Sequence, residues 1–333
     1  MPVNASLRQR SKRSWRKWVL VVAGCFMLAA GWNAVSFFAQ LIKVMPQADS
    51  GFQWPYYRVV SAQVRTHAAR GELIHILVLP NNTGTTHDDF RVHERSALVI
   101  TFLMQKVFGR LKTVILVPVF PRSEENWHIY THALDRDVME TEILELGRLD
   151  LQLEAMIDDT IAHLTQEGWR VNDRVLMWGF SASGMFVNRF ALLHPDRVSG
   201  AVVGSPGGWP IAPAAIWKGH CLRYPIGICD VKALTGVEPD LETYKQVPHL
   251  FFIGDRDEND CVPFQDCYEE QDRDLIFELF GQTPVERWSM AERIYRSAGV
   301  NAEFRLYPGV GHNPMPSLRD SNEFLERVML DAK

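Results

Sequence analysis

Short aliphatic runs recur along this chain, and each of them ends at a turn. They occupy residues 73–79, 113–117, 175–178, 198–203, 249–253 and 302–307. Since most of them are apolar on both alternating faces, they predict strands buried in a parallel sheet. A helical pattern, with apolar residues three or four apart from Leu149 to Leu164, lies between two of them and stops at Gly168. This alternation predicts the α/β class, with a mostly parallel central sheet and helices on both faces.

Charge is distributed unevenly along the 333 residues. Six of the 35 basic residues and none of the 40 acidic residues fall in the first 17 positions, so the remainder carries a balance of −11. An acidic body has no general attraction for phosphate backbones, which argues against a nucleic-acid partner. With 47% hydrophobic residues, the chain is long and apolar enough for one large folded domain.

The basic flank at residues 1–17 is followed by an uncharged stretch over residues 18–42. Its length matches a bilayer span, so we predict an uncleaved signal anchor, a transmembrane helix that is the chain's contact with a membrane. The flank then stays in the cytoplasm and the domain at residues 46–333 is extracytoplasmic, that is periplasmic or extracellular. Two alternatives remain open: cleavage at the small residues 29–34, which would secrete the domain, and lipoprotein processing at Cys25.

Four further cysteines form two close pairs, Cys221 with Cys229 and Cys261 with Cys267. Short loop closure and an oxidising compartment favour one local disulfide within each pair. Four free thiols are the alternative. The first pair lies in residues 206–248, a proline- and glycine-rich segment that interrupts the strand and helix rhythm and that we interpret as a lid inserted over the strand ends.

The strongest local signal for chemistry surrounds Ser181. This serine directly follows the strand at residues 175–178 and precedes a helix that runs to about His194. Small residues two positions before and after it, Gly179 and Ser183, permit a tight strand-to-helix turn. This context is typical of a nucleophile elbow, in which the serine hydroxyl is exposed at a helix N-terminus.

A serine nucleophile needs a base, and the base needs an acid that orients it. His312 lies in a glycine-rich loop after the last predicted strand, a position that no other histidine has. Three carboxylates, Asp255, Asp257 and Asp260, follow the preceding strand. The order Ser, Asp, His along the chain is the one expected for this architecture.

These segments resemble the α/β-hydrolase superfamily over roughly residues 70–330, and within it extracytoplasmic esterases similar to polyhydroxybutyrate depolymerases and feruloyl esterases. The motifs that carry the resemblance are Gly-x-x-Asp at 254–257 and Tyr-Pro-Gly-x-Gly-His at 307–312. The resemblance implies the α/β-hydrolase fold with Asp257 as the acid. Asp255 and Asp260 compete for this role, because the Val-Pro pair that usually follows the acid is displaced to residues 262–263.

Stabilising an oxyanion requires two N–H donors. The amide of Ala182, next to the nucleophile, is the first candidate. The second comes from the loop after the strand at 73–79, where the family often has His-Gly and this chain has Asn81-Asn82. Asn82 stands where that donor is expected, with a simple turn as the alternative.

Other polar and aromatic residues are less specific. Trp127, Tyr130 and Trp209 are candidates for the substrate pocket, with core packing as an equal alternative. A group that imitates a metal cluster is better explained as a solvated loop entering a helix; its members are His87, Asp88, Asp89, His93 and Glu94. We expect neither a metal nor another cofactor.

Together these features predict a serine hydrolase that cleaves carboxylic esters through an acyl-enzyme intermediate. The substrate would be a small-molecule or polymeric ester. A serine peptidase or an acyltransferase with the same triad is the closest alternative, because only the pocket and the exclusion of water would differ. A non-catalytic binding protein on a hydrolase scaffold is the alternative from another class.

Overall fold

Eight strands form the central sheet of the protein, for which the computed structural model describes residues 40–331. In chain order they are β1 (Leu41–Val44), β2 (Tyr56–Val59), β3 (Ile76–Val78), β4 (Val114–Pro118), β5 (Val175–Phe180), β6 (Val198–Gly204), β9 (His249–Gly254) and β10 (Ala302–Tyr307). Across the sheet their order is β1-β2-β4-β3-β5-β6-β9-β10. Strand β2 is antiparallel to β4, and each pair from β4 to β10 is parallel. The predicted α/β class is confirmed.

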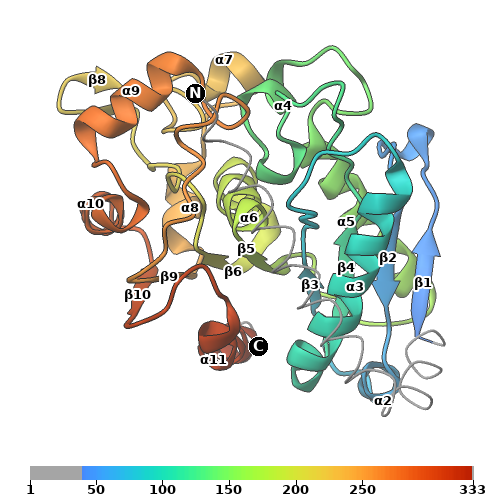
Figure 1. Cartoon of the computed structure of the whole chain (residues 1–333). Helices are drawn as coiled ribbons and strands as arrows, with labels where there is room; N and C mark the ends of the chain where they lie inside the picture. Colours follow the sequence, from blue (N-terminus) through green and yellow to red (C-terminus); the bar gives the residue numbers. More distant parts are fainter. Residues whose placement is uncertain (1–39, 332–333) are drawn as a thin grey trace. The chain divides into compact units, whose positions relative to one another are not determined.

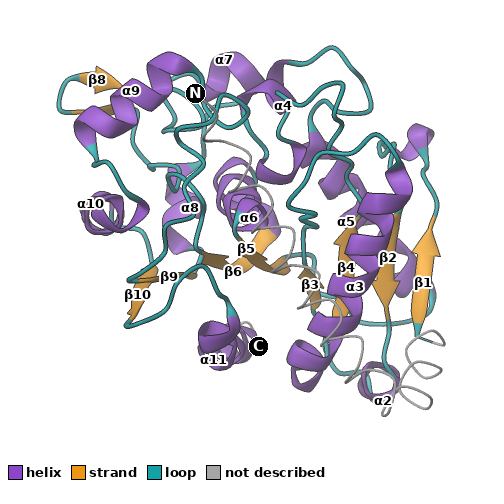
Figure 2. Cartoon of the chain, viewed as in Figure 1, coloured by secondary structure: helices purple, strands orange, loops and turns teal. Residues whose placement is uncertain are grey.

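Helices cover both faces of the sheet (Figures 1 and 2). They are α2 (Ala62–Ala69), α3 (Phe90–Phe108), α4 (Arg136–Glu140), α5 (Leu149–Gln166), α6 (Ala182–Leu193), α7 (Val231–Thr235), α8 (Leu241–Gln246), α9 (Glu270–Leu279), α10 (Pro284–Ala298) and α11 (Leu318–Asp331). Trp178 of β5 contacts α3 through Phe108, with ring centroids 5.6 Å apart, and donates to Ser321 of α11 at 3.4 Å. Helices α5 and α6 pack on the opposite face, in the main hydrophobic core.

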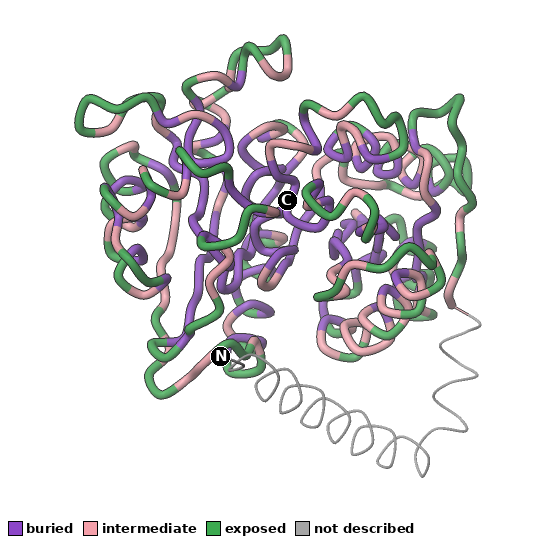
Figure 3. Tube along the Cα trace, turned by 45° about the horizontal axis from the view of Figure 1, so that its top comes forward, coloured by how far each residue is buried: buried purple, intermediate pink, exposed green. Residues whose placement is uncertain are grey.

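The strands predicted from the sequence are largely buried in the structure, with the exception of β10. Strands β3, β4, β6 and β9 are buried at every position, and Figure 3 shows buried positions concentrated in the middle of the molecule. Strand β10 is half-buried because it lies at the edge of the sheet. Strands β1 and β2 were not predicted, since both are short and contain a basic residue, Lys43 or Arg58.

The predicted anchor over residues 18–42 lies outside the described residues up to position 39. Its last two residues, Leu41 and Ile42, belong to strand β1, which begins before residue 46, where we placed the start of the domain. An edge strand needs only partial burial, so Lys43 is tolerated within it. Among residues 40–331, no helix combines the length and the apolar character that crossing a bilayer requires.

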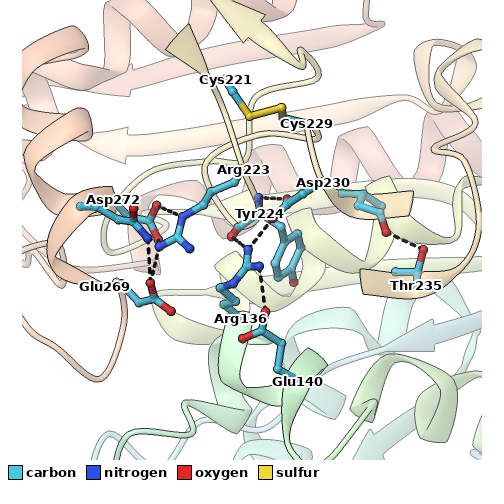
Figure 4. A network of polar contacts seen from close by, with 12 residues as sticks. Arg136, Glu140, Cys221, Arg223, Tyr224, Cys229, Asp230, Thr235, Glu269 and Asp272 are labelled. Atoms are coloured by element: carbon cyan, nitrogen blue, oxygen red, sulfur yellow. Dashed lines mark hydrogen bonds and ion pairs between the residues drawn. A yellow bond between two sulfur atoms is a disulfide. The ribbon is translucent and has the colours of Figure 1, made fainter. Parts of the chain in front are cut away.

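The segment at residues 206–248 contains an internal disulfide and is joined to its surroundings by ion pairs (Figure 4). The strands β7 (Ile216–Trp217) and β8 (His220–Cys221) form a hairpin. A disulfide joins Cys221, at the end of β8, to Cys229, as predicted, and closes the following loop into a ring. Inside this ring, Arg223 binds Asp272 of α9 at 2.6 Å. Just beyond it, Asp230 binds Arg136 of α4 at 2.7 Å. The segment is therefore bound to elements on both sides.

Helix α6 is pinned to α5 by a buried ionic cluster at His194. Its Nε2 lies 2.9 Å from Asp150 and its Nδ1 lies 3.1 Å from Glu154, both on α5. Arg148 and Arg197 complete the cluster. Burial alone would lower the pKa of His194, but the two carboxylates raise it to about 9, and the same contacts lower the pKa of Asp150 to about 2.

This cluster predicts a specific dependence of stability on pH. Because the pKa of His194 is raised on folding, its contribution is complete below its ordinary value of 6.5 and is lost as the pH rises through about 9. The free energy of unfolding from urea titrations should fall over this range by at most about 3 kcal/mol. His194→Gln should remove most of that fall, whereas His163→Gln, at an exposed position of α5, should retain it. Equal pH profiles for wild type and His194→Gln would contradict the assignment.

Candidate active site

Loops that follow four parallel strands bring the predicted site residues to the same edge of the sheet. Ser181 follows β5, Asp257 follows β9, His312 follows β10 and Asn82 follows β3. The carboxyl ends of parallel strands share one edge, which is where open α/β sheets place their sites. The topology therefore groups residues that are far apart in the sequence.

Ser181 occupies the turn between β5 and α6 in a strained conformation. Its φ of 62° and ψ of −127° are unusual for a residue with a side chain. The Ser181 amide donates to the Gly204 carbonyl oxygen at 2.9 Å, which fixes the turn to strand β6. This geometry is the one that a nucleophile elbow requires.

Close packing of α6 against β6 maintains the turn. A Cβ atom at Gly184 would lie 2.6 Å from the Gly204 carbonyl oxygen, so only glycine permits this approach. Ser183, predicted as a small residue of the elbow, is buried, and its hydroxyl donates to the Phe180 carbonyl oxygen at 2.9 Å. Helix α6 thus begins directly over the sheet.

Asp257 and His312 contact each other. The Nδ1 atom of His312 lies 3.0 Å and 3.1 Å from the two carboxylate oxygens of Asp257. A carboxylate can only accept, so Nδ1 carries the hydrogen and Nε2 is left as the basic nitrogen. The Asp257 side chain is 1% exposed and that of His312 is 27% exposed, so the pair has a buried acid and an accessible ring.

The environment of Asp257 favours its ionised form. Burial alone would raise the pKa of this carboxyl, but the hydrogen bond from His312 and further donors hold it below its ordinary value. Those donors include the Asn259 amide at 3.0 Å and the hydroxyl of Ser205. Ser205 follows β6, is buried and has a φ of 38°. Nothing in the sequence pattern identifies it, since a single serine after a strand has no distinctive motif.

Both competing carboxylates have other partners. Asp255 is exposed and accepts from the Gly309 amide at 2.7 Å. This bond joins the loop at residues 255–269, which we call the acid loop after the predicted role of Asp257, to the loop of His312. Asp260 binds the buried guanidinium of Arg287 at 2.6 Å. A Cβ atom at Gly254 would lie 2.1 Å from the Val310 carbonyl oxygen, which explains the glycine of the Gly-x-x-Asp motif.

His312 lies beside the elbow without bonding to the serine. Its ring centroid is 4.5 Å from that of Phe180, the residue that precedes Ser181. Within the described residues, no hydrogen bond joins the Ser181 hydroxyl to His312.

The two predicted oxyanion donors differ in their surroundings. The Ala182 amide belongs to the first turn of α6, where N–H groups have no partner within the helix. The side chain of Asn82 is engaged in a turn, because its Oδ1 accepts from the Gly84 amide at 3.0 Å. The Asn82 backbone N–H has no acceptor among the described residues, so it is available as a donor.

Of the three pocket candidates, Trp209 is a core residue, which corrects its assignment. It is 1% exposed, stacks on Phe280 with ring centroids 3.9 Å apart, and donates to the Ile226 carbonyl oxygen at 2.9 Å. Trp127 is 47% exposed in the loop after β4. Tyr130 is half-buried under the guanidinium of Arg122, which lies 3.6 Å from the ring centroid.

The predicted bridge between Cys261 and Cys267 is wrong, since both thiols are free. The side chains contact each other, and burial raises the pKa of the Cys267 thiol, which favours its protonated form. Short spacing brings two cysteines together, but a bond also requires a specific side-chain geometry. The loop that contains both cysteines is instead held by the ion pair between Arg122 and Asp266.

Within residues 40–331, no three histidine, cysteine, aspartate or glutamate side chains gather where a metal ion could be held. The polar residues at positions 87–94, which imitate a metal cluster in the sequence, have different surroundings in the structure. Asp89 caps α3, and Asp88 accepts from Ser123 at 2.7 Å, as a loop entering a helix predicts. His93, in contrast, is fully buried.

The close packing of α6 against the sheet at Gly184 can be tested by substitution. Gly184→Ala should lower the free energy of unfolding by about 1–3 kcal/mol, because the new methyl group collides with a backbone carbonyl. Gly109→Ala is the matched control, since nothing lies within 4 Å of its Cβ position and its φ is −57°. The check is urea unfolding of both variants, and equal stability of the two would contradict the packing.

Comparisons with known proteins support the architecture. No family model and no curated protein matches the sequence. Two solved structures are similar: poly(aspartic acid) hydrolase-1 from Sphingomonas sp. KT-1, with a TM-score of 0.54, 15% identity and coverage of 86% of this chain and 97% of that one; and the poly(3-hydroxybutyrate) depolymerase LpqC from Bordetella parapertussis, with a TM-score of 0.53, 16% identity and coverage of 88% and 90%. With the strand order and the elbow, these similarities show that the chain has the α/β-hydrolase fold.

Proposed function

We propose that this protein is a serine hydrolase that cleaves carboxylic esters through an acyl-enzyme intermediate. The observation that carries the proposal is the contact between His312 Nδ1 and Asp257 at 3.0 Å, beside a serine held in a strained elbow. Each member comes from the loop expected for nucleophile, base and acid. The roles of the three residues follow from this arrangement.

The reaction would proceed in two steps. Ser181 Oγ attacks the ester carbonyl while His312 Nε2 takes its proton, and Asp257 stabilises the imidazolium that forms. The backbone amides of Ala182 and Asn82 donate to the oxyanion. His312 then protonates the leaving alcohol, and water, activated by the same nitrogen, releases the acid and restores the serine.

The substrate is a small-molecule or polymeric ester in this proposal. The two similar structures are described as a poly(aspartic acid) hydrolase and a poly(3-hydroxybutyrate) depolymerase, so this architecture accommodates polymeric substrates. The exposed Trp127 offers an apolar contact for the substrate, and half-buried Tyr130 lies near it in sequence on the same loop. We assign residues 206–248 to a cap over the carboxyl ends of the strands.

We also propose an extracytoplasmic location for the domain. The disulfide between Cys221 and Cys229 supports it, because such bonds persist in oxidising compartments. The basic flank at residues 1–17 and the uncharged stretch at 18–42 would anchor the chain in the membrane.

The central test replaces the nucleophile. Ser181→Ala should reduce ester hydrolysis by roughly three to six orders of magnitude, because no other group supplies the attacking oxygen. The assay is hydrolysis of p-nitrophenyl esters of varied chain length, with circular dichroism as the control for folding. Near-normal turnover in a folded Ser181→Ala protein would remove the proposal.

The acid is tested by comparing three carboxylates. Asp257→Asn should lower kcat by about 10⁴-fold, because the carboxylate sets the tautomer of His312. Asp255→Asn should cost less than about tenfold, since it contacts only a loop amide. Asp260→Asn should reduce stability instead, because Arg287 would lose its partner. If Asp255→Asn were the inactive variant, the acid would be misassigned.

Location is tested with a reporter fused after Lys333. A periplasmic or extracellular reporter should be active and a cytoplasmic one inactive, and the protein should remain with membranes after a carbonate wash. A soluble protein with a new N-terminus within residues 29–35 would show that the segment is cleaved. Activity of the cytoplasmic reporter would contradict the proposed location.

A further inference from the structure

His93 lies completely buried on α3, directly behind the loop that carries Asn82. Its Nδ1 is 3.1 Å from the Thr83 hydroxyl, and its Nε2 is 2.9 Å from the His87 carbonyl oxygen. A carbonyl oxygen can only accept, so Nε2 carries the hydrogen and Nδ1 accepts the single hydroxyl hydrogen of Thr83, whose oxygen also lies 3.1 Å from the Thr85 carbonyl oxygen. Burial lowers the pKa of His93, so the neutral ring is the relevant form.

The loop is fixed on both sides of Asn82. The Asn81 amide group donates to the Phe120 carbonyl oxygen at 2.8 Å, and its Oδ1 accepts from the Phe120 amide at 3.0 Å. On the other side, Thr83 contacts His93. One turn along α3 from His93, Ser96 contacts the Asn82 carbonyl oxygen at 3.5 Å.

The same histidine reaches the neighbouring loop after β4. The connection runs through His87, whose carbonyl oxygen accepts from His93 Nε2 and whose amide donates to the Arg122 carbonyl oxygen at 2.8 Å. Arg122 is also paired with Asp266 of the acid loop. His93 therefore connects the Asn82 loop to the part of the structure that holds the acid.

We propose that His93 is a positioning residue, which holds the Asn82 backbone N–H in the direction required of the second oxyanion donor. This inference rests on the proposed function, because an oxyanion forms only if the protein performs acyl transfer. His93 itself does not touch the substrate. It acts through Thr83, and the geometry of a donor matters because small displacements from the oxyanion weaken transition-state stabilisation.

The experiment is a double-mutant cycle of His93→Phe and Thr83→Val in the full chain. Each single variant should lower kcat at least about tenfold with KM within about twofold, and the double variant should be no worse than His93→Phe alone. Inhibition by a phenylboronic acid, whose tetrahedral adduct places an oxygen at the donors, should weaken by the same factor. His163→Gln on α5 is the histidine control and should change neither quantity.

A second readout does not depend on catalysis. Amide hydrogen exchange over residues 82–85 should accelerate at least about tenfold in both single variants, while exchange in strand β5 stays unchanged. Thr83→Val keeps the measurement possible if His93→Phe does not fold. Unchanged exchange, or unchanged kcat and boronate affinity in folded variants, would overturn the role of His93. Failure of the wild type to hydrolyse any ester would instead overturn the proposed function, and the exchange data would still decide whether His93 fixes the loop.

Discussion

The close approach of helix α6 to strand β6 is the constraint on which the rest of the site depends. It requires glycine at position 184, and it forces Ser181 into a backbone conformation with positive φ. Such strain costs of order 1–3 kcal/mol and persists only where surrounding structure over-determines it. Here the surrounding structure is a buried parallel strand on each side and the ionic cluster that joins α6 to α5.

Around this rigid centre, buried polar contacts fix the neighbouring loops. Arg189 of α6 is fully buried and donates to the Ala133 carbonyl oxygen at 2.8 Å and to the Tyr268 hydroxyl at 3.1 Å. One side chain of α6 thus holds the loop after β4 and the end of the loop after β9. Ion pairs of Arg122 and Arg287 secure the same acid loop. These contacts hold the loop that contains Cys261 and Cys267, for which we predicted a second disulfide.

The sequence predicted the features that depend on local pattern. Six strands and the helix at α5 follow from apolar periodicity, and the order of Ser181, Asp257 and His312 follows from motifs at the ends of strands. The contact between Asp257 and His312 agrees with the motif, whereas their catalytic roles remain proposals that the experiments test.

What the sequence did not predict depends on three-dimensional neighbours. Trp209 stands in a proline-rich segment that resembles a surface cap, yet it packs against Phe280 from a distant loop. The polar neighbours of His93 in the sequence predict a solvated position. In the structure, helix α3 buries this side chain in the interior. The short sequence separation likewise predicts that Cys261 and Cys267 lie close together, but it does not determine whether they form a disulfide.

The central claim is that Ser181 is a nucleophile activated by His312, and covalent labelling tests it most directly. The folded protein should be incubated with a fluorophosphonate, digested and mapped by mass spectrometry. The account predicts one stoichiometric adduct, on the peptide that contains Ser181, formed at least about 10³-fold more slowly in His312→Ala. A folded protein that acquires no adduct, or acquires it on a different serine, would contradict the account.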